Sequence, residues 1–104
     1  MASQELNLPA LQLRGEKLYK TQMWDEALPV LQEYVERCPA DARMRLRLAA
    51  MNVEIQERPR YALRVLAKMD SESLDQRLRR WRSKIEARAR QMIDDGVLEL
   101  DLGS

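Results

Sequence analysis

The sequence contains no histidine and no phenylalanine, and only one cysteine, among its 104 residues. Without histidine, the chain lacks the commonest general base and the commonest metal ligand. It also lacks a glycine-rich phosphate loop, a CxxC pair and an HExxH motif, each of which would indicate catalysis or metal binding. The sequence therefore predicts no catalytic residue, no metal site and no cofactor.

Signals for secretion and membrane insertion are also missing. The first five residues hold no basic region followed by an apolar run. No apolar stretch reaches the ~18–20 residues that are needed to cross a bilayer. The single cysteine, Cys38, cannot form an internal disulfide. These features predict a cytoplasmic protein, or a cytoplasmic part of a longer one, without membrane insertion.

Residues that favour helix dominate the chain, because Leu, Ala, Arg, Glu, Gln and Met are frequent while Thr and Val are few. Apolar residues recur at helical spacing almost throughout, and this pattern predicts five helices. We expect Asn7, Asp25 and Asp41 to cap the first three helices. Pro59 suits the first turn of the fourth helix.

The fifth predicted helix is the longest. Ser73 and Gln76 have the spacing of a capping box, so we expect this helix to begin at that motif. One apolar stripe then runs from Leu74 to Met92 with steps of three and four residues. Gly96 is well placed to end the helix.

The chain contains an internal repeat. A shift of 35 residues superposes apolar and small positions, and a period of about 20–50 residues is typical of stacked supersecondary units. Short links between the helices make each unit an antiparallel pair. The superposed positions are Leu11 and Leu46, Leu13 and Leu48, Gly15 and Ala50, Leu18 and Val53, Ala27 and Ala62, Leu28 and Leu63, and Leu31 and Leu66.

The first unit resembles a tetratricopeptide repeat. Gly15, Ala27 and Pro39 lie twelve residues apart, as the small, Ala and Pro positions of that family do. Residues 24–27, Trp-Asp-Glu-Ala, are similar to the family's aromatic-Asp-Glu-Ala corner. Small residues at the crossing of two helices allow their backbones to approach closely. The unit departs from the family pattern at Arg14, where an aliphatic residue is preferred.

The resemblance implies an all-α fold, in which two antiparallel helix pairs stack as a short right-handed solenoid and a long C-terminal helix caps them. A generic five-helix bundle is the alternative. We expect a flexible N-terminus (1–7), one domain (8–96) made of repeat 1 (8–41), repeat 2 (43–74) and the capping helix (74–95), and an acidic-apolar tail (97–104). The expected core is Leu11, Gly15, Leu18, Ala27, Leu28, Leu31, Leu46, Ala50, Val53, Ala62, Leu66, Leu78, Trp81 and Ile85.

The resemblance also implies a non-catalytic protein-interaction module, such as a scaffold, adaptor or assembly factor, that holds a peptide or helix in its concave face. One family variant binds a terminal carboxylate there, but Gln12 and Glu16 occupy its decisive positions and disfavour that activity. The residues that would line the concave face could instead be ordinary solvated positions without a binding role. The expected partner-binding residues are Gln12, Glu16, Tyr19, Lys20, Arg47, Met51, Glu54, Ile55, Arg82, Glu86 and Arg90.

Charge is distributed unevenly. Residues 43–90 hold 14 basic and 6 acidic side chains, whereas residues 91–104 hold no basic and 4 acidic ones. The basic fifth helix suggests binding of nucleic acid or another polyanion as the alternative function. Trp81 falls in the apolar stripe of that helix and would not offer a stacking surface, so a protein partner is favoured. We expect a monomer or a weak homo-oligomer.

Overall fold

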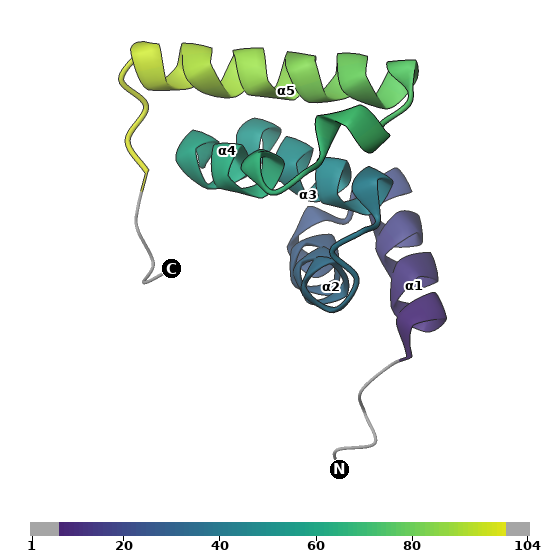
Figure 1. Ribbon diagram of the computed structural model, residues 1–104. Helices are drawn as coiled ribbons and strands as arrows, with labels where there is room; N and C mark the ends of the chain where they lie inside the picture. Colours follow the sequence, from purple (N-terminus) through teal and green to yellow (C-terminus); the bar gives the residue numbers. More distant parts are fainter. Residues whose placement is uncertain (1–6, 100–104) are drawn as a thin grey trace.

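A computed structural model describes residues 7–99 of the chain (Figure 1). Within this range the regular structure is helical, and no strand occurs. The helices are α1 (Leu8–Lys20), α2 (Trp24–Arg37), α3 (Ala42–Glu54), α4 (Pro59–Ala67) and α5 (Gln76–Asp94), with a short 3-10 turn at Ser71–Ser73. None of the helices in this range combines the length and hydropathy needed to cross a membrane.

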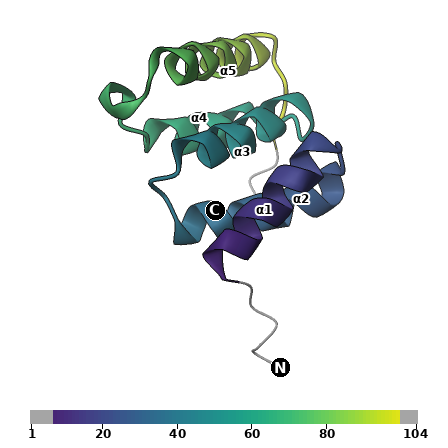
Figure 2. The ribbon, with the colours of Figure 1, turned by 90° about the vertical axis from the view of Figure 1, so that its right-hand side faces the viewer.

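The helices form three layers in chain order. α1 and α2 make the first antiparallel pair, α3 and α4 the second, and α5 covers the second pair (Figures 1 and 2). α3 contacts both α1 and α2, and α5 contacts both α3 and α4. This arrangement confirms the predicted fold class of two stacked helix pairs with a capping helix.

Two of the predicted caps are present. The side chain of Asn7 accepts a hydrogen bond from the Ala10 amide at 2.8 Å, so α1 begins where the sequence predicts. Asp41 caps α3 by accepting from the Met44 amide at 3.2 Å. Pro59 lies in the first turn of α4, where its missing N–H is not needed.

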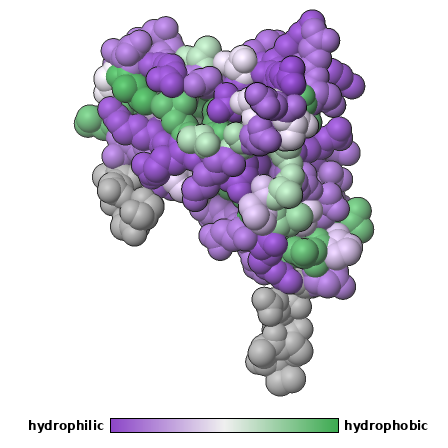
Figure 3. All heavy atoms as spheres, viewed as in Figure 1, coloured by the Kyte–Doolittle hydropathy of each residue, from purple (hydrophilic) through white to green (hydrophobic). Residues whose placement is uncertain are grey.

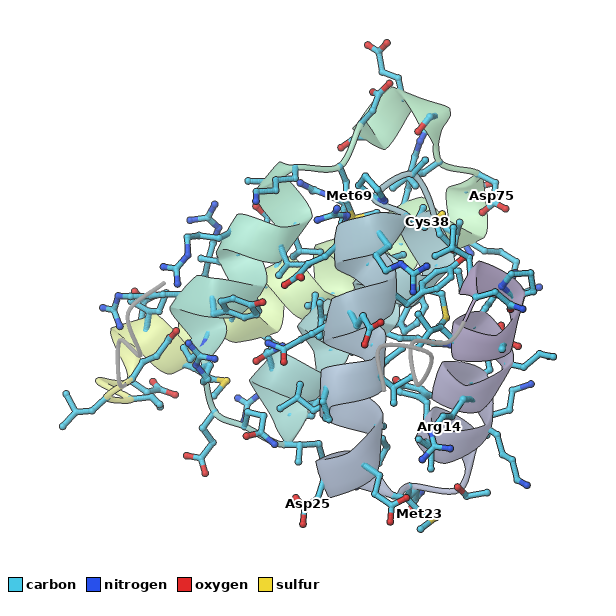
Figure 4. All side chains as sticks on the ribbon, turned by 90° about the horizontal axis from the view of Figure 1, so that it is seen from below. Arg14, Met23, Asp25, Cys38, Met69 and Asp75 are labelled. Atoms are coloured by element: carbon cyan, nitrogen blue, oxygen red, sulfur yellow. The ribbon has the colours of Figure 1, made fainter. Side chains whose placement is uncertain are left out.

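The predicted cap at Asp25 is wrong. α2 begins one residue earlier, at Trp24, and its cap residue Met23 makes no side-chain hydrogen bond. Asp25 lies within the first turn, where a carboxylate still stabilises the helix through its dipole. Figure 4 shows Met23 and Asp25 at the same end of the first hairpin, and both are exposed.

The predicted capping box is also wrong. Ser73 ends the 3-10 turn, and its hydroxyl donates to the Asp70 carbonyl at 2.7 Å. Asp70 accepts from the Glu72 amide at 3.0 Å, which holds this turn in a separate, tighter geometry. α5 therefore begins later, at Gln76, and Asp75 caps it by accepting from the Leu78 amide at 2.9 Å.

Close packing at Gly15 explains the small residue in α1. A Cβ atom at this position would lie 3.1 Å from both Leu31 Cδ2 and Met44 Cε, a distance that real Cβ contacts rarely reach. Ala27 and Ala62, the repeated alanines of α2 and α4, are both fully buried. The small positions of the repeat therefore lie where helices pack tightly.

The core is larger than predicted because α3 is enclosed. α3 packs against α1, α2, α4 and α5, so every residue from Met44 to Val53 is buried, on all sides of the helix. A single apolar stripe could not predict this. Leu28, Leu78 and Trp81 were expected in the core but are only partly buried. The additional core residues are Tyr34, Val35, Met44, Leu48, Ala49, Met51, Val65, Leu74, Ala89 and Met92.

The N-terminus of α4 is capped by a residue far away in the sequence. Its own cap residue, Arg58, makes no side-chain hydrogen bond. Instead, the Glu99 carboxylate accepts from the amides of Arg60 at 2.6 Å and Tyr61 at 2.8 Å. A carboxylate at this position satisfies two unpaired N–H groups and also interacts favourably with the helix dipole. Part of the acidic tail is therefore tied to the second repeat.

The C-terminus of α4 is held by two arginines from neighbouring helices. Arg45 of α3 donates to the Val65 carbonyl at 3.3 Å, and Arg82 of α5 donates to the Leu66 carbonyl at 3.2 Å. Cations favour this end of a helix because its carbonyls are unpaired and carry partial negative charge. Both ends of the nine-residue α4 thus depend on tertiary contacts.

Candidate functional site

A groove lies between α3 and the start of α5. Its cavity has a volume of about 370 Å³. Three arginines and one carboxylate line it, together with two apolar side chains that come from α5. The lining residues are Arg43, Arg47, Asp75, Arg77, Leu78 and Trp81.

The groove continues along α5. A second cavity of about 200 Å³ is bordered by Glu54 on α3 and by Lys84 and Ile85 on α5. Trp81 borders both cavities. Because its indole is only partly buried, it offers apolar surface at the centre of a basic groove. We call the two cavities together the α3/α5 groove.

The Arg47 guanidinium is held in place by contacts with α1. It forms a salt bridge with Glu16 at 3.1 Å, and its Cζ lies 5.4 Å from the centre of the Tyr19 ring. Tyr19 in turn packs edge-on against Trp24, with ring centres 5.4 Å apart. Burial raises the pKa of the Tyr19 hydroxyl, although the nearby Arg47 opposes this effect, so the hydroxyl stays neutral at pH 7. The contacts orient one arginine of the groove before any partner arrives.

A junction between the two hairpins lies beside these contacts. The Asp41 carboxylate accepts from the Tyr34 hydroxyl at 2.8 Å and from the Gln12 side-chain amide at 3.1 Å. Asp41 also caps α3, so a single side chain ties α1, α2 and α3 together. Burial and the hydrogen bond to Asp41 raise the pKa of Tyr34.

The structure places the predicted binding residues of α1 and α3 in different environments. Gln12, Glu16, Tyr19 and Arg47 meet at the contact between the two helices, through the bonds described above. Met51 is only 1% exposed, so it belongs to the core and does not reach a partner. Lys20, Glu54 and Ile55 are exposed.

The predicted residues of α5 do not join the groove. Arg82 donates to the end of α4 and pairs with Glu86 at 3.5 Å, and Arg90 pairs with the same Glu86 at 3.1 Å. Trp81, one residue earlier, faces α3 instead. A shift of one residue rotates a side chain by about 100° around a helix, so the predicted residues Arg82, Glu86 and Arg90 lie on a different face of α5 from Trp81.

Sequence reasoning therefore missed Arg43, Arg77, Leu78 and Trp81 as groove residues. A signal was available, because Arg43 and Arg47 lie one helical turn apart, as do Arg77 and Trp81. What the sequence could not give was the rotation of α5 about its axis, which depends on its packing against α3 and α4.

Figure 3 shows a mainly hydrophilic surface, with hydrophobic residues exposed along the seam between α5 and α4 and again near α1.

Two stacked helix pairs with a capping helix and an open groove define the class of helical-repeat proteins. The model of the tetratricopeptide repeat family matches residues 8–51, which include α1, α2 and most of α3. This match assigns the first helix pair and most of α3 to the family, whose repeats generally mediate protein–protein interactions and are generally non-catalytic. No curated protein and no solved structure matches the chain significantly. Among residues 7–99, no group of three or more Cys, Asp or Glu is arranged to hold a metal ion.

Proposed function

We propose that this chain is a scaffold, adaptor or assembly factor that binds an acidic segment of a partner protein in the α3/α5 groove. The observation that carries the proposal is the lining of the groove, where four cations outnumber two carboxylates. The cations are Arg43, Arg47, Arg77 and Lys84, and the carboxylates are Asp75 and Glu54. Such an excess of guanidinium groups attracts carboxylates, which they can bind in a two-pronged geometry.

The apolar residues of the groove suggest the rest of the partner's chemistry. Trp81 and Leu78 form apolar surface beside the arginines. Aromatic and arginine side chains together are typical of the energetically dominant positions of protein interfaces. We therefore expect a helix or extended peptide that places one apolar side chain on Trp81 and its acidic side chains next to the arginines.

The contacts of Arg47 favour binding by a preformed site. Its salt bridge with Glu16 and its position over Tyr19 fix the guanidinium, so less side-chain entropy is lost when a partner carboxylate approaches. Because Glu16 already pairs with Arg47, a carboxylate of the partner must bind Arg47 together with Glu16. Arg43 and Arg77 supply further donors at the same cavity.

An affinity capture with paired variants tests the proposal. The groove variant carries Arg43→Glu and Arg77→Glu, and the matched control carries Arg80→Glu and Arg88→Glu, which change the charge equally at exposed positions outside the lining of the groove. We expect a protein retained by the unchanged chain to be retained by the control and lost by the groove variant. Equal retention by both variants contradicts the proposal.

Fluorescence then tests whether the captured partner enters the groove. The chain has two tryptophans, so Trp24→Phe leaves Trp81 as the single reporter. We expect the purified partner, or its acidic segment, to shift the emission of Trp81 in a saturable way. Binding without any change in Trp81 emission would place the partner elsewhere.

Binding of a polyanion such as nucleic acid remains the alternative function. The observation in its favour is the row of exposed basic side chains on α5: Arg77, Arg79, Arg80, Lys84, Arg88 and Arg90. A nucleic-acid complex would weaken steeply with salt, since each neutralised phosphate releases counterions. Binding of a nonspecific oligonucleotide at ~50 mM salt, lost on raising the salt, would favour this alternative. No binding at low salt eliminates it.

A further inference from the structure

A separate cavity lies on the other side of α3, between α2 and α4. Its volume is about 590 Å³, which exceeds that of the α3/α5 groove cavity at Arg47. Arg45 of α3 lines it, whereas Arg47 lines the groove. Residues two apart on a helix project about 200° from each other, so the two arginines serve opposite faces. We call this space the α2/α4 cavity.

Arg45 is a buried cation without a counter-ion. Its side chain is 6% exposed, and it forms no salt bridge with any carboxylate in residues 7–99. Its hydrogen bonds go to two backbone carbonyls, those of Pro39 at 3.4 Å and Val65 at 3.3 Å. Burial lowers the pKa of this guanidinium. A buried charge that is compensated only by carbonyl dipoles is costly, and a carboxylate beside it would offset that cost.

Further cations surround the same cavity. Arg64 of α4 and Lys68, directly after α4, line it, and Glu36 on α2 is the single carboxylate among the lining residues. Tyr61 also lines it, with the Arg64 guanidinium carbon 5.6 Å from its ring centre. The Tyr61 hydroxyl accepts from the Gln32 side chain at 3.5 Å, a contact that joins α4 to α2 across the cavity. The cavity is thus a basic site that helix packing has already formed.

The remaining wall is apolar. Val35 of α2, Leu48 of α3 and Val65 of α4 all line the cavity and belong to the hydrophobic core. A phosphate or another simple anion would use the cations alone. A peptide that combines an acidic with an apolar side chain would also use this wall, and it matches both halves of the lining.

We infer that the α2/α4 cavity is a second binding site, which holds a carboxylate side chain of an acidic-apolar peptide segment from a partner protein. Arg45 meets the carboxylate from within the cavity, while the exposed side chains of Arg64 and Lys68 attract it from the last turn and the end of α4. An apolar neighbour in the peptide packs on Val35 and Val65. This site does not depend on the α3/α5 groove, since the two lie on opposite faces of α3.

The test uses the full chain and two capped pentapeptides, Leu-Glu-Leu-Glu-Leu and its amide analogue Leu-Gln-Leu-Gln-Leu. Backbone amide shifts are followed by ¹⁵N NMR during each titration. We expect the acidic peptide to shift the amides around Arg45, Val65 and Lys68 in a saturable way, and the amide analogue to leave them unchanged. Inorganic phosphate serves as the third probe and should bind at least about tenfold more weakly than the acidic peptide, because it cannot use the apolar wall.

Variants locate the site. Arg64→Glu with Lys68→Glu should weaken binding of the acidic peptide by at least about tenfold, because both changes place carboxylates next to the ligand. Arg43→Glu with Arg77→Glu, in the other groove, should leave this binding unchanged. Circular dichroism checks that each variant folds. If the double variant does not fold, Arg45→Gln gives a second test of the same site.

Several outcomes would overturn the inference. Equal binding of the two peptides shows that no carboxylate is recognised, and equal binding of phosphate shows a simple anion site. Shifts confined to the α3/α5 groove assign the peptide to the proposed function instead. If changes in the α3/α5 groove abolish capture of a partner while the peptide still binds the α2/α4 cavity, the two sites are independent and the inference stands.

Discussion

The two helix pairs of this chain resemble each other in outline but are stabilised in different ways. The first pair has helices of 13 and 14 residues, and α1 starts with a cap supplied by the adjacent residue, Asn7. The second pair joins a buried α3 to α4, which has only nine residues and no local side-chain cap. The family model matches the first pair and ends within α3. The sequence pattern of the repeat is therefore strong in the first helix pair and weak in the second.

The difference shows how a weak repeat can still fold. A helix of nine residues is unstable in isolation, so tertiary contacts must supply its stability. Glu99 caps the start of α4, while Arg45 and Arg82 bind its last carbonyls. These three residues come from the tail, from α3 and from α5. The second repeat consequently depends on the capping helix and the tail in a way that the first does not.

The largest effect that tests this comparison concerns the paired core leucines. Leu31 and Leu66 occupy equivalent positions of the two repeats and are 0% and 1% exposed. Each change to Ala should lower the free energy of unfolding by about 2–5 kcal/mol, because it leaves a cavity in a closed core. Urea unfolding measures both. Leu13→Ala, at a 68% exposed position, is the control and should have little effect. A loss under ~1 kcal/mol at either leucine would mean that its repeat is loosely packed.

Alkaline pH tests the junction between the pairs. Burial and the hydrogen bond to Asp41 raise the pKa of Tyr34, so the folded state favours the neutral phenol. This stabilisation is fully present below pH ~10, the ordinary pKa, and is lost as the pH rises above it, by about 1.4 kcal/mol per pH unit. Tyr34→Phe should make unfolding free energy less dependent on pH above ~10. A residual dependence is expected from Tyr19, whose pKa is also raised. An unchanged slope in Tyr34→Phe would show that the junction does not hold this proton.

The smallest effect compares a local cap with a distant one. Asn7→Ala and Glu99→Ala each remove a side chain that caps a helix, and each should lower stability by about 0.5–2 kcal/mol. The loss at Glu99 should shrink with added salt, since part of it comes from charge–dipole attraction, whereas the loss at the neutral Asn7 should not. Thermal melts at low and high salt measure both. If Glu99→Ala has no effect at low salt, the tail does not support α4.

Much of the helical arrangement follows from the sequence. The caps Asn7 and Asp41 and the position of Pro59 gave the helix boundaries, because each acts through its neighbours in the chain. The repeated small residues Gly15 and Ala27 gave the pairing of the helices, because their spacing marks positions where helices pack tightly. One error fell where two local signals competed. At the start of α5, Ser73 and Asp75 both had cap chemistry, and the preceding 3-10 turn decided between them.

The candidate site was predicted less well, for a geometric reason. The prediction found Glu16, Tyr19 and Arg47, which the structure brings into contact between α1 and α3. It missed Trp81 and chose Arg82, although the two are adjacent in the sequence. The repeat period fixes neither the rotation of α5 nor which side of it faces α3.

The sequence by itself determined the class of this protein, its helix pairs and the close approach at Gly15, since hydrophobic spacing acts within each helix and the small residues recur at the repeat's positions of tight helix packing. Only the tertiary structure decided which arginines face a groove, which lie buried and which hold the ends of α4. Those assignments depend on how whole helices rotate against each other, and that rotation is set by the packing of all five helices together.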